Sequence, residues 1–209
     1  MLGEIQNTTA KKNDIEGQLT RILIEVMRTK NFDRSTVCIP CAKKTVFRLK
    51  ENMVEIDVVT DSISKVLEYI SSNFTVVDIR KVQERKSYQN PGMLEISNHL
   101  LECEVLSSSE RFWECHTALE SVWMHSGTEY RIFLQSIILF SSSQAKYQMS
   151  NADAAKKMYL RAHTMLLNSG KSSMVLTGLK DDFYYPINWR FNIPDNIRAR
   201  FYLRYFRLQ

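Results

Sequence analysis

The hydrophobic pattern of this chain changes its period at Gln89-Asn90-Pro91-Gly92. Before this point the pattern switches repeatedly to a period of two, as in half-buried strands, and after it apolar residues recur with the period of a helix. The residue before a proline resists the helical region, and Pro-Gly favours a turn. We therefore predict an α+β N-terminal domain over residues 1–90, an all-α antiparallel helical bundle over 91–170, and a basic, aromatic extension over 171–209.

The first domain is predicted to hold about four strands and one helix. Three segments alternate apolar and polar side chains, and the first of them also fits a helical spacing. A helix is predicted after Asp61, a suitable N-cap residue, and a β-rich run follows it. The predicted strands cover residues 22–26, 47–50, 54–58 and 75–82, and the helix covers 63–70.

The bundle is predicted to hold four helices joined by short connections, which force neighbouring helices to be antiparallel. Its first helix begins at Met93 and ends at the serines 107–109. A serine with a glutamate three residues later predicts a capping box for the second helix. The predicted caps and stops are, in chain order, Ser107 with Glu110, Gly127, Thr128, Asn151 and Gly170.

The net charge of +5 is concentrated near the C-terminus, where residues 184–209 hold five arginines and one aspartate, a net of +4. The remaining residues hold 23 basic and 22 acidic side chains, a net of +1. A helix capped by Asp195 would carry an arginine row that could bind phosphates beside aromatics that stack on bases. We favour packing of its aromatic face on the first domain or on a second copy. The row is Arg200, Arg204 and Arg207, and the apolar face is Ile197, Phe201, Tyr205 and Leu208.

Composition places the chain among ordinary globular proteins, with 44% apolar and 24% charged residues. The first residues lack the apolar core of a secretory signal. The longest apolar run, 132–140, is shorter than the roughly 20 residues that span a bilayer. We expect a cytoplasmic protein without a membrane partner.

The four cysteines are expected to be reduced thiols, because no export signal is visible. Cys38 and Cys41 have the spacing of a zinc knuckle or a redox pair. Cys103 and Cys115 are twelve residues apart on different predicted helices, which is unlike the two close pairs of a structural zinc site. We favour four small, buried, apolar side chains.

The second bundle helix places a histidine and a carboxylate on one face. His116 and Glu120 are four residues apart, so their Cβ atoms lie about 6 Å apart. Both could ligate one divalent ion such as zinc, or the carboxylate could fix the imidazole tautomer for proton transfer. A third interpretation is a polar network with Gln144 that only orders the bundle. The predicted core stripe of this helix is Phe112, Cys115, Leu119 and Val122. The candidate site lies beside that stripe, with His116 and Glu120 as its catalytic or metal-binding residues. Its predicted walls are Trp113, Trp123, Gln135 and Gln144.

A metal site needs at least one ligand beyond this pair. The sequence offers several acidic and histidine side chains in the same region, and none stands at a diagnostic spacing. These candidates are Glu110, Glu114, His125, Asp153 and His163.

The segment from Arg111 to Trp123, RFWECHTALESVW, carries the pattern His-x3-Glu-x2-Trp at His116, Glu120 and Trp123. With the following Phe-Leu-Gln at 133–135, it resembles a small bacterial and archaeal helical family, the domain of unknown function 309, over roughly residues 93–168. The resemblance implies an all-helical bundle and a motif associated with metal binding, without an established reaction. Three positions depart from the family pattern: Ser136 and Ser150 stand where glycine is usual, and Lys146 stands where histidine is frequent.

The sequence supports two functional hypotheses, one catalytic and one not. The first is a metal-binding or acid–base site at His116 and Glu120, of hydrolytic type. The alternative is a non-catalytic module that binds nucleic acid through the C-terminal arginines, or a protein, with a homodimer as one assembly. No P-loop, Gly-x-Gly-x-x-Gly or Ser/His/Asp order supports nucleotide-dependent chemistry or the best-known hydrolase constellations.

Overall fold

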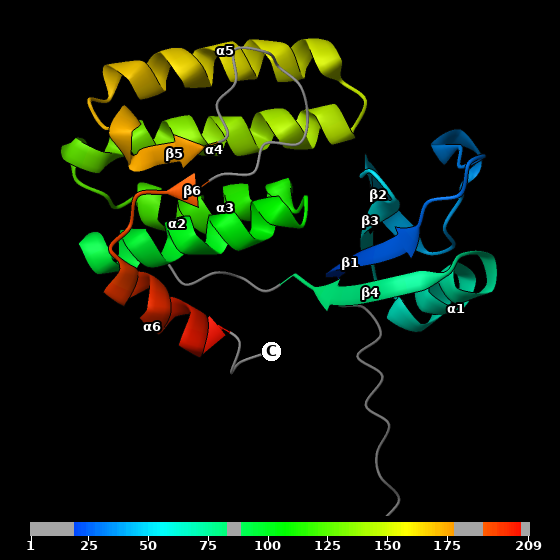
Figure 1. Cartoon of the computed structure of the whole chain (residues 1–209). Coiled ribbons are helices and arrows are strands. Elements are labelled where there is room, and N and C mark those ends of the chain that lie inside the picture. The colour runs from blue at the N-terminus through cyan, green and yellow to red at the C-terminus, as the bar shows by residue number, and fades with distance from the viewer. Residues whose placement is uncertain (1–18, 83–88, 178–189, 206–209) are drawn as a thin grey trace, which may run out of the picture. The chain divides into compact units, whose positions relative to one another are not determined.

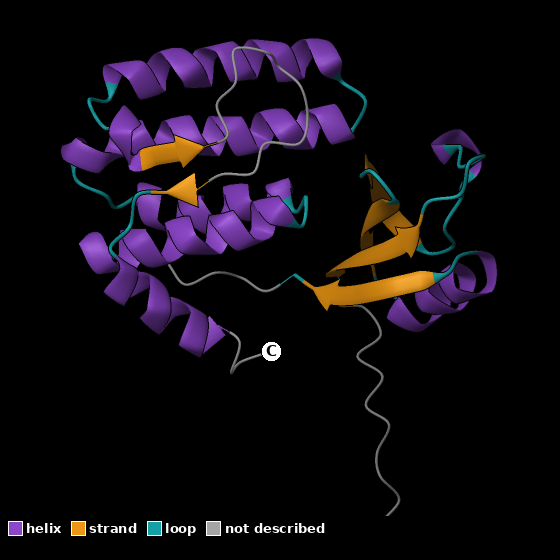
Figure 2. Ribbon diagram, in the orientation of Figure 1, coloured by secondary structure: helices purple, strands orange, loops and turns teal. Residues whose placement is uncertain are grey.

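A computed structural model describes residues 19–82, 89–177 and 190–205 (Figure 1). These residues form two compact units. The first comprises 19–46 and 56–82, and the second comprises 47–55, 89–177 and 190–205. Figure 2 shows the larger sheet together with a helix in one part of the chain, and most of the helices together with two short strands in the other. The predicted order, an α+β domain followed by a helical bundle, is confirmed.

The N-terminal sheet has four strands in the order β2-β3-β1-β4. β1 and β4 pair antiparallel, with Ile24 opposite Ile79 and a register shift at Glu25 and Val26. The segment 19–27, which also fitted a helical spacing, is therefore a strand. The elements are β1 (Thr20–Met27), the 3-10 turn η1 (Arg34–Thr36), β2 (Ala42–Leu49), β3 (Met53–Thr60), α1 (Ile63–Asn73) and β4 (Val76–Lys81).

Alternation explains the two faces of this sheet. One set of alternate residues on β1 and β3 is apolar and buried together with two side chains of α1, because strand side chains point to opposite faces in turn. The other set includes ion pairs, in which Arg21 binds Asp57 at 2.6 Å and Arg80 binds Glu25 at 3.0 Å. The buried apolar residues are Ile22, Ile24, Val26, Val54, Ile56, Val58, Val66 and Ile70.

The predicted cap of α1 is wrong. Ser62, not Asp61, occupies the N-cap position, and its side chain makes no capping hydrogen bond. The Asp61 carboxylate instead binds Lys43 Nζ at 2.9 Å. An ion pair with a residue 18 positions earlier in the chain thus takes the carboxylate that was expected to cap the helix.

The bundle follows as four helices with short connections at residues 109–111, 124–127 and 149–151. Figure 1 shows α4 and α5 side by side and antiparallel. No helix in the described ranges is long and apolar enough to cross a membrane. The helices are α2 (Met93–Ser108), α3 (Phe112–Trp123), α4 (Thr128–Gln148) and α5 (Ala152–Asn168).

Helix ends in the bundle follow the predictions only in part. The N-cap of α5 is confirmed, since Asn151 Oδ1 accepts a hydrogen bond from the Ala154 amide at 3.2 Å. The capping box is wrong, because Ser107 Oγ donates to a carbonyl of its own helix and the N-cap of α3 is Arg111. α3 also ends at Trp123, before the predicted stop, and the predicted cap Thr128 is already the first residue of α4.

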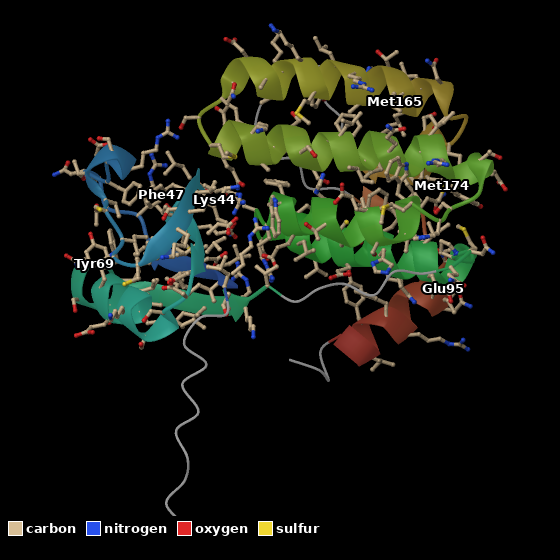
Figure 3. All side chains as sticks on the ribbon, turned by 180° about the vertical axis from the view of Figure 1, so that it is seen from behind. Lys44, Phe47, Tyr69, Glu95, Met165 and Met174 are labelled. Carbon is tan, nitrogen blue, oxygen red and sulfur yellow. The ribbon has the colours of Figure 1, made fainter. Side chains whose placement is uncertain are left out.

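The bundle core is continuous with a C-terminal segment in which the sequence predicted only the last helix, and that helix is present from Asp195. Phe191 and Ile193 are buried in the core cluster, and Ile197 and Phe201 pack against it. Met174, labelled in Figure 3, also packs against this core. The elements are η2 (Ser172–Met174), β5 (Val175–Thr177), β6 (Arg190–Phe191), which pairs antiparallel with β5, and α6 (Asp195–Tyr205).

Candidate functional site

α3 is held in place by its apolar stripe. Phe112, Cys115, Leu119 and Val122 are fully buried, as predicted. Because a helix turns about 100° per residue, the adjoining stripe lies at the edge of the buried face. That stripe is half-buried throughout and consists of Trp113, His116, Glu120 and Trp123.

The candidate pair meets on this stripe. His116 Nε2 lies 3.4 Å from Glu120 Oε1. This separation exceeds the roughly 2.7–3.2 Å of a good N–H···O hydrogen bond and is within ion-pair reach. The imidazole side chain is 27% exposed and the carboxylate side chain 46% exposed, so both reach solvent. A water molecule or a small hydroxyl group has access to the pair.

Three buried polar atoms of the predicted site residues lack hydrogen-bond partners among the described residues. They are His116 Nδ1, Trp123 Nε1 and Gln144 Oε1. Buried polar atoms are normally satisfied by protein or by ordered water. The proposed polar network therefore has no direct hydrogen bond to the Gln144 carbonyl oxygen among the described residues.

Burial lowers the pKa of His116 below its ordinary value of 6.5, and the nearby Glu120 carboxylate opposes this with a smaller upward effect. Desolvation dominates, because it penalises the charged imidazolium. The ring is therefore neutral at neutral pH, which is the form that accepts a proton.

This pKa shift predicts how stability depends on pH. The unfolded chain takes up a proton at His116 at a higher pH than the folded chain, so the folded state loses stability as pH falls below about 6.5. We expect His116→Gln to make this loss shallower, as measured by urea unfolding at pH values from about 7 to about 5. His163→Gln, a change of a half-buried histidine on α5, is the control. Equal slopes for wild type and His116→Gln would contradict the prediction.

The predicted walls lie on α3 and α4. Trp123 is approached by the Arg131 guanidinium at 5.4 Å from the ring centroid. Trp113 is approached in the same way at 5.2 Å by Arg48, which belongs to the second unit. Gln135 on α4 is half-buried. The two indoles thus have cations on their faces, and such contacts orient the rings.

The further metal ligands considered from the sequence do not gather around the pair. Glu114 binds Arg111 through two hydrogen bonds of 2.7 and 2.6 Å, and Glu110 accepts the Glu51 amide at 3.2 Å. Across the described ranges, no three His, Cys, Asp or Glu side chains form a group that could hold a metal ion. A bound divalent ion stays a prediction.

The described helix of the basic tail packs on its own bundle. α6 contacts α2, and Ile197 and Phe201 supply the apolar contact. Arg200 is exposed on α6. The Arg204 side chain, and Arg207 as a whole, lie outside what the structure describes. A nucleic-acid surface at these arginines stays a prediction.

Glu104 and Arg198 form an anchor that the sequence analysis missed. Glu104 on α2 is buried, accepts the Phe191 amide, and binds both terminal nitrogens of Arg198. The hydrogen bond to Glu104 is the main cause that raises the pKa of Arg198 above its usual value. The two residues are 94 positions apart, so no local spacing could have joined them.

All four cysteines are free, but the expectation that all are buried is wrong. Cys103 and Cys115 are buried, and the Cys103 thiol donates to the Cys115 carbonyl at 3.5 Å. Cys38 is exposed and Cys41 is half-buried, in the connection that precedes β2. The Cys-x-x-Cys segment therefore lies in a loop and not in a core element.

In a comparison with protein families, residues 102–158 match the model described as domain of unknown function (DUF309). The DUF309 resemblance is confirmed for this segment. The matched DUF309 segment includes α3 with His116 and Glu120, and all of α4. Comparisons with curated proteins and with solved structures gave no match.

The departures from the DUF309 pattern have structural counterparts. Ser150 has a φ of 59°, in the left-handed region that favours glycine, so a glycine here would be unstrained. Ser136 is fully buried, and its hydroxyl donates to the Phe133 carbonyl at 2.6 Å. The Ser136 hydroxyl thus has a hydrogen-bond partner inside its own helix. The backbone of Ser150 adopts a strained, left-handed conformation.

Proposed function

We propose that His116 and Glu120 form an acid–base site of hydrolytic type. The observation that supports it is the 3.4 Å approach of Nε2 to Oε1 on a stripe where burial keeps the imidazole neutral. A neutral imidazole near neutral pH is a suitable general base. The free thiols at all four cysteines support a cytoplasmic location as part of this proposal.

The roles of the two side chains differ. Nδ1 of His116 is buried, so Nε2 is the nitrogen that a water or substrate hydroxyl can reach. In the proposed step Nε2 accepts a proton from water, the resulting hydroxide attacks a carbonyl carbon, and the imidazolium returns the proton to the leaving group. The Glu120 carboxylate offsets the positive charge that the ring gains. Trp113 and Trp123 flank the pair along the same stripe.

Metal binding at the same motif is the second form of the proposal. Nε2 and Oε1 would be two ligands, whereas catalytic zinc sites use three protein ligands. The described residues supply no third His, Cys, Asp or Glu in a suitable group. Metal analysis of purified wild type and His116→Gln tests this form, and one ion per chain that disappears in the variant would support it.

The experiment for the acid–base proposal uses an activated ester, p-nitrophenyl acetate, with the full chain. We expect His116→Gln to reduce the rate of ester hydrolysis about 100-fold, the lower end of what general acid–base catalysis contributes. Glu120→Gln should reduce it less, because the base remains.

The matched control is His163→Gln on α5, which removes a half-buried imidazole away from the motif. It should leave the rate unchanged, and melting curves should show that both variants remain folded. A rate for His116→Gln equal to that of wild type would overturn the proposal.

A further inference from the structure

β4 is an edge strand of the first unit. In the described part of the chain it pairs with β1 alone. Its exposed side chains include two β-branched apolar residues, Val77 at 50% and Ile79 at 45%. Exposed edges of this kind are templates for pairing with another strand, and natural proteins usually blunt them with charge, proline or bulges.

The backbone of β4 shows which residues are available to a new strand. The Val82 amide donates to the Arg21 carbonyl at 3.0 Å. In a regular antiparallel ladder the residues that bond to one neighbour alternate with those that point away. The backbone groups of Arg80 and Asp78 therefore point toward β1, and those of Ile79 and Lys81 point outward.

Charge selects one register for a strand that pairs with its own copy. Centred on Ile79, an antiparallel pair places Asp78 opposite Arg80 of the second copy, and Arg80 opposite Asp78. Centred one residue earlier or later, it places Asp78 opposite Asp78 or Arg80 opposite Arg80. Opposite charges across strands stabilise a pair and like charges destabilise it. The register centred on Ile79 is thus the self-complementary one.

Side-chain exposure fits the same register. The Asp78 side chain is 44% exposed even though it binds Arg80 of its own strand, so it has room for a second cation. Arg80 is 17% exposed and is held by Glu25 at 3.0 Å, which fixes its position on the sheet. The register shift of β1 and β4 at Glu25 and Val26 limits regular pairing to the segment from Asp78 onward.

We propose that the outer edge of β4 is an interaction surface for a second copy of this chain, which pairs antiparallel about Ile79. A two-fold axis then passes beside Ile79, as in an isologous dimer. The two sheets become one across the axis, and Val77 and Ile79 of both copies lose exposure to water.

Cysteine cross-linking in the full chain tests the register. In a hydrogen-bonded antiparallel pair the Cα atoms of opposite residues are about 5.5 Å apart, within the range that a disulfide bridges. In the same register, Val77 of one copy is opposite Lys81 of the other. The two Val77 residues are therefore offset by four residues along the strand, which is about 13 Å at ~3.3 Å per residue. With Cys38 and Cys41 replaced by serine, Ile79→Cys should give a disulfide-linked dimer under glutathione disulfide at least ten times faster than Val77→Cys.

The charges provide a second measurement on the Ile79→Cys chain. Asp78→Lys puts a cation opposite Arg80 of the second copy and should slow cross-linking about ten-fold. The matched control is Glu68→Lys, the same charge change at an exposed position of α1, which should leave the rate unchanged. Equal rates for cysteine at 77 and 79, no dimer from Ile79→Cys, or equal slowing by both lysine variants would each overturn the proposal.

Discussion

Replacing Phe140 with alanine should lower the free energy of unfolding by about 4 kcal/mol, within the roughly 3–5 kcal/mol that follows truncation of a large aromatic in a packed core. Phe140 on α4 is fully buried. Its ring packs edge-on against Tyr159 of α5, with the centroids 5.2 Å apart. The variant loses both the transfer free energy of the ring and the contacts around the cavity that remains.

Urea unfolding of wild type and variant measures this change. The control is Ile132→Ala on the same helix, where the side chain is 45% exposed and truncation should cost less than about 1 kcal/mol. Similar costs at the two positions would show that the interior between α4 and α5 is loosely packed, contrary to the structure.

Glu104→Ala should be the second most destabilising change, at about 3 kcal/mol, because it leaves a partly buried guanidinium without its counter-ion. Arg198 is 16% exposed in the pair and Glu104 is 8% exposed. The Phe191 amide also loses its acceptor, which adds the cost of a buried unsatisfied donor. We expect the segment 190–205 to become sensitive to limited proteolysis while the rest of the bundle remains protected.

A surface pair provides the comparison for Glu104. Glu129 binds Lys171 at 2.8 Å with its own side chain 69% exposed, and exposed pairs of this kind contribute up to about 1 kcal/mol. Glu129→Ala should therefore have little effect. A double-mutant cycle with Arg198→Leu isolates the pair, and a coupling energy near zero between positions 104 and 198 would contradict the anchor.

The periodicity of the sequence was sufficient for the strands of the first domain and for the long helices, because burial enforces it, but it did not predict β5 or β6. On α3 the apolar stripe at Phe112, Cys115, Leu119 and Val122 is fully buried, and its neighbours His116 and Glu120 therefore lie where spacing predicted. Asn151 was also predictable as a cap, since its side chain bonds to its own helix. Predictions from local sequence succeed where the side chain binds a group in its own helix.

The predicted helix caps are wrong where the expected capping side chain binds a different group. Asp61 binds Lys43, and Glu110, predicted to cap α3, accepts the Glu51 amide instead. The Glu104 anchor on the C-terminal segment spans 94 positions, so its partner depends on the whole topology. The same holds for the orphaned atoms of His116 and Trp123, which only a packed structure reveals.

The anchor at Glu104 also bears on how the chain folds during synthesis. Its partners, the Phe191 amide and the Arg198 guanidinium, are 87 and 94 residues further along the chain. Domains usually begin to fold from the N-terminal side as they leave the ribosome. Until residues 190–205 emerge, α2 carries a carboxylate without a counter-ion and an apolar face without its cover. The core of the bundle is therefore completed only when α6 docks on α2.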